Sequence, residues 1–388
     1  MDTHQPLSPI DHIFTGSGSY PIEFIFSYSG RLDEKALRVS LERILENFPV
    51  VRSTLVKSST YSWSFETSPA GLHFEVRETE DNPDDPACHH RFIDPVHTAE
   101  GEPLIRILIS QTPRGSVLGA SISHALADGF SYFHFLTSWA AAFHGMPIQQ
   151  PVHARELLIP DLPESSPFTG PEETLRQSGL FLGEVRRPAP RQELVWVSEV
   201  FPQARLNALQ EDAQQNCSQR LSHNDVLAAW LWKKYTLQWG MPDGGGISYI
   251  SCPVDFRRIV DGFPRTYFGN AVALATTGLP FDELEQSNLG ALALNIRSAV
   301  AGINADRVRE SMHCLEQLRR QEGLEVCERL HVCHPHRGLL VTNLSRLPVP
   351  QVAFNAGPPR HFAILTQARR GAVVLPHPEG VEVRICCP

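Results

Sequence analysis

A short apolar strand, a sharp turn and an apolar helix follow one another near the middle of this chain, and they restrict its fold more than any other feature. Residues Val117–Ile122 read VLGASI, small and apolar at every position, which is typical of a strand buried on both faces. From Phe130 to Ala140, apolar residues recur at helical spacing and predict a helix over Gly129–Ala142. The chain must therefore reverse direction around His124.

This turn places an imidazole at the end of a strand and a carboxylate, Asp128, at the start of a helix. An imidazole titrates near neutral pH and can remove a proton from a hydroxyl or an amine, so His124 is a candidate general base. The alternative is a hydrogen-bonded core histidine. For Asp128 the spacing leaves two roles open, a helix N-cap that accepts a backbone N–H or a chemical role.

A proline-rich stretch divides the chain into two halves. Eight prolines fall between Pro147 and Arg191, which leaves room for short regular elements and predicts a surface linker. We therefore expect an N-terminal domain over 1–150, a crossover linker over 151–195 and a C-terminal domain over 196–388. Each half mixes strand and helix patterns, for example a helix over Glu34–Asn47 that Asp33 is placed to cap, and the fold class is predicted to be α+β.

Composition excludes several classes of protein. With 388 residues, 42% of them apolar and 20% charged, the chain has material for two ordinary domains. A run of about 18 apolar residues, as a membrane span requires, is absent from the sequence. The residues Met1–Pro6 lack the basic and apolar segments of a secretion signal, so we expect a cytoplasmic protein. The net charge of −9 and the lack of a basic cluster argue against nucleic acid as a partner.

The eight cysteines show no CxxC pair and no regular framework, so they are predicted to be reduced thiols. Zinc accepts the side chains present in Cys327, Cys333, His334 and His336, but their spacing fits no common zinc motif and no metal site is predicted. A nucleophilic role for Cys252 is conceivable, although no histidine is near it in sequence, so a packing role is favoured.

The motif His124-Ala125-Leu126-Ala127-Asp128-Gly129 resembles the HxxxDG pattern of the BAHD-type acyltransferases and their relatives, the condensation domains and polyketide-associated acyltransferases. Other stretches resemble landmarks of that family in the same order along the chain. They are the opening Leu7–His12, the segment Leu37–Arg52, the helix Leu221–Trp230, the arginine motif Val254–Arg258, the YFGN motif Tyr267–Asn270 and the threonine strand Leu340–Pro348.

The resemblance implies two similar mixed-sheet domains of the chloramphenicol-acetyltransferase type, with a channel between them. His124 would be the general base, reached from both ends of that channel. Thr342 would donate a hydrogen bond to the oxyanion, with Asn343 as a second candidate. Because strand alternation sends these two side chains to opposite faces, at most one of them is expected at the site.

The resemblance also implies structural roles beside the base. Asp128 and Gly129 would support the loop, with Asp128 turned away from substrate to pair with Arg257, or with Arg258 as the fallback. A further group would line the acceptor side of the channel, unless it is an ordinary strand start with a turn glycine. That group consists of Tyr267, Phe268, Gly269 and Asn270.

One landmark departs from the family pattern. Where plant members carry DFGWG, residues Ala353–Pro359 read AFNAGPP, without the Asp and the Trp. In the family this loop supports the fold and the coenzyme end of the channel, so the acyl donor is open to question. Relatives that take acyl groups from a carrier protein commonly lack the motif too.

The prediction is a cofactor-independent acyltransferase, with acyl-CoA as co-substrate. It would move the acyl group to a hydroxyl or amine of a small-molecule acceptor, of the specialised-metabolite kind, in a ternary complex. One alternative is a condensation-like enzyme fed by an acyl carrier protein, and another is a cyclase or a binding protein of the same fold. The sequence leaves open the acyl group, the acceptor, O- or N-acylation and the oligomeric state.

Overall fold

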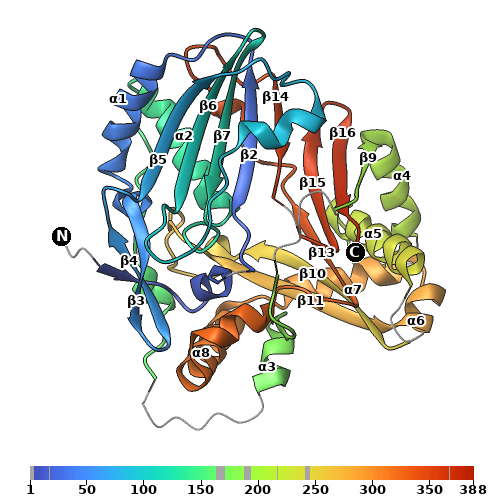
Figure 1. The fold of residues 1–388 in the computed structure, drawn as a ribbon. Helices are drawn as coiled ribbons and strands as arrows, with labels where there is room; N and C mark the ends of the chain where they lie inside the picture. Colours follow the sequence, from blue (N-terminus) through green and yellow to red (C-terminus); the bar gives the residue numbers. More distant parts are fainter. Residues whose placement is uncertain are drawn as a thin grey trace.

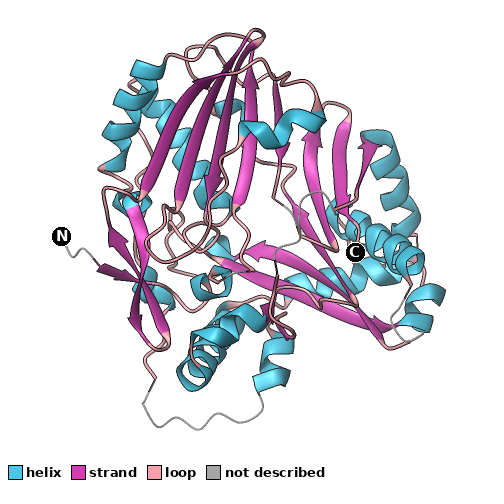
Figure 2. Cartoon of the chain, viewed as in Figure 1, coloured by secondary structure: helices cyan, strands magenta, loops and turns pink. Residues whose placement is uncertain are grey.

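The computed structural model describes residues 4–16, 18–162, 171–187, 194–215, 217–240, 245–366 and 368–388. Two large sheets lie side by side, one built largely from each half of the chain (Figure 1). Most helices lie at the outer sides of these sheets (Figure 2). The predicted α+β architecture with two mixed-sheet domains is confirmed.

The N-terminal sheet has five strands in the order β14-β2-β7-β6-β5, and β5 and β6 are its parallel pair. Their bounds are β2 Ile22–Tyr28, β5 Leu72–Glu78, β6 Ile105–Thr112, β7 Gly115–Ile122 and β14 His361–Ile364. Every residue of β2 and β7 is buried. Gly119 of β7 has no room for a Cβ against the main chain of Phe92, so close packing on that face requires a glycine.

Two helices pack together beside this sheet, α1 (Glu34–Leu45) and α2 (Gly129–Phe143). The side chain of Asp33 accepts a hydrogen bond from the Ala36 amide, which confirms the predicted cap of α1. Helix α1 ends two residues before the predicted Asn47, whereas α2 matches its predicted range to within one residue.

The C-terminal sheet has six strands in the order β11-β10-β13-β15-β16-β9. Its bounds are β9 Trp196–Pro202, β10 Ile247–Asp255, β11 Val272–Pro280, β13 Gly338–Asn343, β15 Gly371–His377 and β16 Gly380–Cys386. The central strands β10, β13 and β15 are parallel and the outer pairings are antiparallel. The helices of this half are α4 Gln203–Gln214, α5 His223–Trp239, α6 Phe281–Gln286, α7 Leu289–Ala301 and α8 Ala305–Glu322.

Smaller elements complete the fold. A three-stranded sheet contains β1 (His4–Pro6), β4 (Ser62–Thr67) and β3 (Ser53–Ser59). The expected linker contains three short elements, a 3-10 helix (Arg155–Leu158), α3 (Pro171–Gln177) and β8 (Phe181–Leu182). Strand β8 pairs with β12 (Leu330–His331) of the second half. Residues 163–170 and 188–193 of that linker lie outside the described part of the chain.

Strand β14 lies in the second half of the sequence, between β13 and β15. It nevertheless pairs with β2 of the N-terminal sheet, from His361 opposite Ser27 to Ile364 opposite Phe24. In the described ranges, no helix is long and apolar enough to cross a bilayer.

Candidate active site

The HxxxDG loop connects the end of β7 to the start of α2. Ser123 and the four residues from Ala125 to Asp128 are buried, whereas His124 is partly exposed. The amides of Leu126 and Ala127 donate to the Ser123 carbonyl, which closes the turn. A tightly bonded, buried loop thus presents a single imidazole.

Two aromatic rings surround this imidazole. Phe14 stacks on His124 with ring centroids 3.9 Å apart and planes at 12°, and Tyr20 meets it edge-on at 5.8 Å and 90°. The Nδ1 atom of His124 is buried without a hydrogen-bond partner, so Nε2 is the nitrogen available for proton transfer. Burial lowers the pKa of His124, although its own carbonyl group and Asp128 act in the opposite direction. The imidazole is therefore held neutral, which is the form a base requires.

Asp128 and Arg257 form a buried ion pair behind the loop. Both carboxylate oxygens accept from the guanidinium, at 2.8 and 3.1 Å, and the two side chains are 2% and 1% exposed. The same carboxylate accepts from the amides of Ser131 and Ala271, so Asp128 caps α2 and pairs with Arg257 at once. Burial acts to raise the pKa of Asp128, but Arg257 and these amides lower it overall. The carboxylate thus joins the first turn of α2 to Arg257 and to the start of β11.

Gly129 is the first residue of α2, and a side chain there would meet Leu344 beyond the end of β13. Arg258 lies on the 3-10 helix Phe256–Arg258 next to Arg257, and the ion pair to Asp128 is made by Arg257. The pairing expected for Arg257 is thus present in the structure.

A second buried ion pair supports the loop from the other side. The Arg155 Nε lies 3.0 Å from Asp11 Oδ2, with both side chains fully buried, and Arg155 also donates to the Leu126 carbonyl at 2.7 Å. The Asn270 amide donates to Asp11 at 2.7 Å and to the carbonyl of His124 at 2.8 Å. The main chain of the loop is therefore fixed by one carboxylate–arginine pair on each side.

The YFGN residues are buried where the two cores meet. Tyr267 packs in the core of the C-terminal half, and the neighbouring Phe268 packs in that of the N-terminal half, 5.2 Å from the ring of Phe48. Gly269 has a φ of +155°, and a Cβ there would lie 2.9 Å from the Tyr267 ring, so glycine is required. Its carbonyl accepts from Arg257. The structure thus places these residues behind the loop, where they hold Asp128, Arg257 and His124 in position.

Thr342 and Asn343 lie on opposite faces of β13. Asn343 is exposed, and its amide donates to the Asn224 side chain at 2.6 Å, at the start of α5. Thr342 shares its strand face with Leu340, which lines the cavity between the halves, and with Leu344, which adjoins Gly129. Of the two candidates, Thr342 is the one on the face toward the HxxxDG loop.

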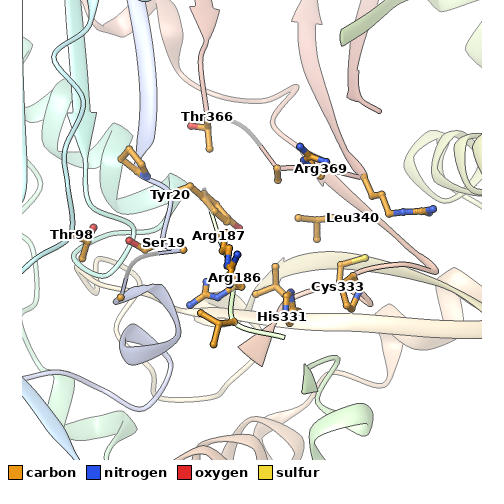
Figure 3. A pocket seen from close by; sticks show the side chains of 18 of the residues that line it. Ser19, Tyr20, Thr98, Arg186, Arg187, His331, Cys333, Leu340, Thr366 and Arg369 are labelled. Carbon is orange, nitrogen blue, oxygen red and sulfur yellow. The ribbon is translucent and has the colours of Figure 1, made fainter. Parts of the chain in front are cut away.

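The cavity between the halves has a volume of about 950 Å³. Its described walls come from three parts of the chain. They are residues 16, 18–21, 23 and 95–99 of the first half, 184–187 and 194 of the linker, and 331–336, 340, 365, 366 and 368–370 of the second half. Tyr20 lines this cavity (Figure 3), and its ring also meets that of His124 edge-on. The imidazole therefore lies directly behind a wall residue of the cavity.

A second cavity, of about 940 Å³, opens on the other face of β13 beside Asn343. Three arginines line it together with the first turn of α5, and no Asp or Glu is among its described lining residues. The arginines are Arg220, Arg297 and Arg346. Arg297 is 3.0 Å from Asp225 in the adjoining helix.

The cysteines do not form a reactive centre. Burial raises the pKa of Cys252 to about 12, and that of Cys333 likewise, so both are held as neutral thiols. Among the described residues, no three His, Cys, Asp or Glu side chains are arranged to hold a metal ion.

The loop that departs from DFGWG belongs to the N-terminal half. Phe354 is 1% exposed and packs edge-on against Trp139 and Phe143 of α2, at 5.0 and 5.4 Å. Asn355 donates to the Arg31 carbonyl and accepts from the Asp33 amide. The retained phenylalanine therefore anchors the loop, and its residues are not among the described lining residues of either cavity.

Sequence reasoning missed three residues of the site, Phe14, Tyr20 and Arg155. Phe14 lies on a 3-10 helix (Asp11–Phe14) whose first two residues end the opening motif Leu7–His12, so that motif could have indicated this segment. Nothing in the sequence pointed to Arg155, which lies within the proline-rich stretch and meets Asp11 only through the fold.

Comparison with known proteins identifies the family. The model of the Transferase family matches residues 5–388. The chain is 27% identical to anthranilate N-benzoyltransferase protein 1 of Dianthus caryophyllus over 276 residues, 68% of this chain and 59% of that protein. It is 26% identical to a hydroxycinnamoyltransferase of Narcissus pseudonarcissus over 372 residues, 90% of this chain and 82% of that protein.

Solved structures share the fold. The F. sporotrichioides TRI101 structure, complexed with coenzyme A and T-2, superposes with a TM-score of 0.76 at 17% identity and covers 98% of this chain and 94% of its own. The vinorine synthase structure superposes with a TM-score of 0.70 at 18% identity, and the match covers 98% of this chain and 89% of the vinorine synthase chain. With a family match over almost its whole length, this chain belongs to the Transferase family, the BAHD-type acyltransferases.

Proposed function

We propose that this protein transfers an acyl group from a coenzyme A thioester to a hydroxyl or amine of a small-molecule acceptor, with His124 as general base. The observation that carries the proposal is the neutral, partly exposed imidazole on a rigid, buried loop beside the cavity between the halves. Relatives named for benzoyl and hydroxycinnamoyl transfer support the reaction class.

The chemistry takes place in a ternary complex. His124 Nε2 accepts the proton of the acceptor's O–H or N–H as that oxygen or nitrogen attacks the thioester carbonyl carbon. The carbonyl oxygen becomes an oxyanion, and the C–S bond then breaks. The leaving thiolate takes the proton from His124, which returns to its neutral form, and free coenzyme A and the acylated acceptor are released.

Thr342 is the proposed oxyanion donor. Its hydroxyl makes no hydrogen bond to other described residues, and it lies on the β13 face between Leu340 and Leu344. Asn343 faces the second cavity with its amide bonded to Asn224, so it is proposed to act there and not on the oxyanion.

The second cavity is the proposed donor site. Arginines bind phosphate oxygens through several N–H groups, and a helix N-terminus adds favourable backbone N–H dipoles. Arg220, Arg297 and Arg346 beside the first turn of α5 supply both. Because the divergent loop at Ala353–Pro359 lines neither cavity, its departure from the family motif does not favour a carrier-protein donor.

The test is release of free thiol from a panel of acyl-CoAs, with and without mixed hydroxyl and amine acceptors. Acceptor-dependent thiol release that is lost in His124→Ala would support the proposal. Turnover from the same acyl group on a carrier protein, with none from coenzyme A, would establish the condensation-like alternative. Ligand binding without thiol release from either donor would favour a binding protein or a cyclase.

Cytoplasmic location is part of this proposal. All eight cysteines are unpaired, as expected for a protein kept in a reducing compartment.

A further inference from the structure

The imidazole of His124 makes no hydrogen bond to a carboxylate of the described residues. The two acidic side chains that act on it, Asp128 and Asp11, are each held in a buried ion pair, with Arg257 and with Arg155. Both carboxylates favour the protonated imidazole, but burial outweighs them and the pKa of His124 stays below its usual value. The cation that forms when His124 takes a proton therefore meets carboxylates that are already paired.

The ring of Phe14 covers one face of this imidazole. The two ring centroids are 3.9 Å apart and the planes are 12° from parallel. At such a distance the negative face of an aromatic ring attracts a cation, most strongly where water is excluded. Phe14 is 6% exposed and belongs to the core of the C-terminal half, so little water reaches the stack. The contact is therefore stronger with an imidazolium than with a neutral imidazole.

The segment that carries Phe14 is fixed on both sides of this residue. Asp11, at the start of the same 3-10 helix, is held by its buried pair with Arg155. The hydroxyl of Thr15, the next residue after the helix, donates to the His12 carbonyl at 2.8 Å. The phenyl ring is thus in place before substrate binds, and a group placed in advance needs no reorganisation when charge develops.

Tyr20 is the other aromatic residue beside the imidazole. Its ring is perpendicular to that of His124, with centroids 5.8 Å apart. Burial raises the pKa of its phenol, although Arg186 opposes that rise, so the phenol is neutral wherever the imidazole titrates. In the part of the chain that the structure describes, the titratable groups beside His124 are thus Tyr20, Asp11 and Asp128.

Resting on the proposed function, we propose that Phe14 is a positioning residue for the base. Its ring holds the plane of the imidazole and stabilises the imidazolium that forms as the acceptor loses its proton. That proton moves from the O–H or N–H of the acceptor to Nε2 of His124 and then to the leaving thiolate, and Phe14 takes part in no bond change. It contributes through the difference in its attraction for the two protonation states of the imidazole.

The experiment replaces Phe14 in the full chain by phenylalanines that carry one, two and three ring fluorines. Fluorine withdraws electron density from the ring face and changes the ring size little, so the attraction for a cation weakens stepwise while the packing is kept. With the most active donor and acceptor of the thiol-release panel, kcat should fall at each step and KM should stay near that of the parent. Phe14→Leu, which removes the ring face, should lower kcat by about twofold to thirtyfold, the equivalent of a cation–π attraction of about 0.5–2 kcal/mol.

An NMR titration without substrate provides a second measurement. The imidazole signal of His124 is identified by its absence in His124→Ala. Its pKa should fall in the same order as the number of fluorines at position 14 rises, because the protonated form loses more of its stabilisation at each step. A residue that only fills space would not produce this order.

Phe24 provides the matched control. It is 1% exposed on β2 and packs against Phe26 and Tyr132, with no recorded ring contact to an imidazole among the described residues. The same fluorinated residues at position 24 should leave kcat and the pKa of His124 as in the parent. A kcat that is independent of the number of fluorines at position 14, or an equal decline at position 24, would overturn the inference.

The two measurements separate this inference from the proposed function. If the parent releases no thiol from any acyl-CoA and the pKa of His124 still follows the number of fluorines at position 14, the stack stands and acyl transfer is refuted. Acceptor-dependent thiol release that is unaffected by the same substitutions would leave acyl transfer standing and refute the role of Phe14.

Discussion

Replacing Asp128 by asparagine should destabilise the fold strongly, because it leaves Arg257 buried without its main counter-charge. The pair is at most 2% exposed, and the remaining carboxylate near Arg257, Asp255, is 43% exposed and at 3.1 Å. Breaking such a buried pair costs about 3–5 kcal/mol. An unfolding entropy of about 2.1 cal/mol/K per residue gives about 0.8 kcal/mol/K for 388 residues. If the halves unfold together, the melting temperature should therefore fall by about 4–6 °C.

Differential scanning calorimetry at pH 7 measures this shift, and Asp255→Asn is the matched control. It removes a carboxylate from the same arginine at a solvent-exposed position, where an ion pair is worth about 0–1 kcal/mol. The double variant Asp128→Asn with Arg257→Met should be less destabilised than the two single effects together, since no buried charge is left unpaired. An unchanged melting temperature in Asp128→Asn with loss of activity would refute the structural role and indicate that Asp128 acts on the imidazole.

Further expectations concern the base and its surroundings. His124→Ala should lower kcat by about a hundredfold to ten-thousandfold with a melting temperature near that of the parent, and a loss of only a few fold would contradict general-base catalysis. Burial lowers the pKa of His124, and a general base must be neutral, so kcat/KM should rise with pH below about 6.5 and level off above it. A kcat/KM profile that rises only at higher pH would exclude His124 as the general base. Thr342→Val should reduce kcat by about a hundredfold or more, and Asn343→Ala should reduce it by a few fold. A larger loss in Asn343→Ala than in Thr342→Val, measured in steady-state assays, would make Asn343 the oxyanion donor. Arg155→Leu should cost about 3–5 kcal/mol in calorimetry by leaving Asp11 buried and unpaired, and a shift within error would show that this pair does not support the loop.

Local patterns predicted the part of the site that is contiguous in sequence. The strand before His124 and the helix after it were readable because small apolar residues and a helical repeat lie directly next to each other. Of the two roles that spacing left open for Asp128, the structure shows the N-cap. The same carboxylate has a second oxygen and also makes the pair with Arg257 that the resemblance implied.

Local sequence patterns did not predict which distant segments of the chain are in contact. Arg155 meets Asp11 across 144 residues, and nothing local distinguishes it from an exposed arginine. The YFGN residues were predicted to line the channel, whereas the structure buries their side chains, because Tyr267 and Phe268 fill two different cores. Helix α8 was not predicted, although Val308, Met312 and Leu315 recur at helical spacing and are buried.

The pairing of β14 with β2 has a consequence for anyone who divides this protein at its proline-rich stretch. A fragment that ends near Gln150 would lack residues 361–364 and leave one side of β2 without its hydrogen-bonded neighbour. An uncovered edge of a long apolar strand is a template for intermolecular pairing, so such a fragment should aggregate when produced alone. Chimaeras between relatives should therefore exchange the β14 segment together with the first half of the chain.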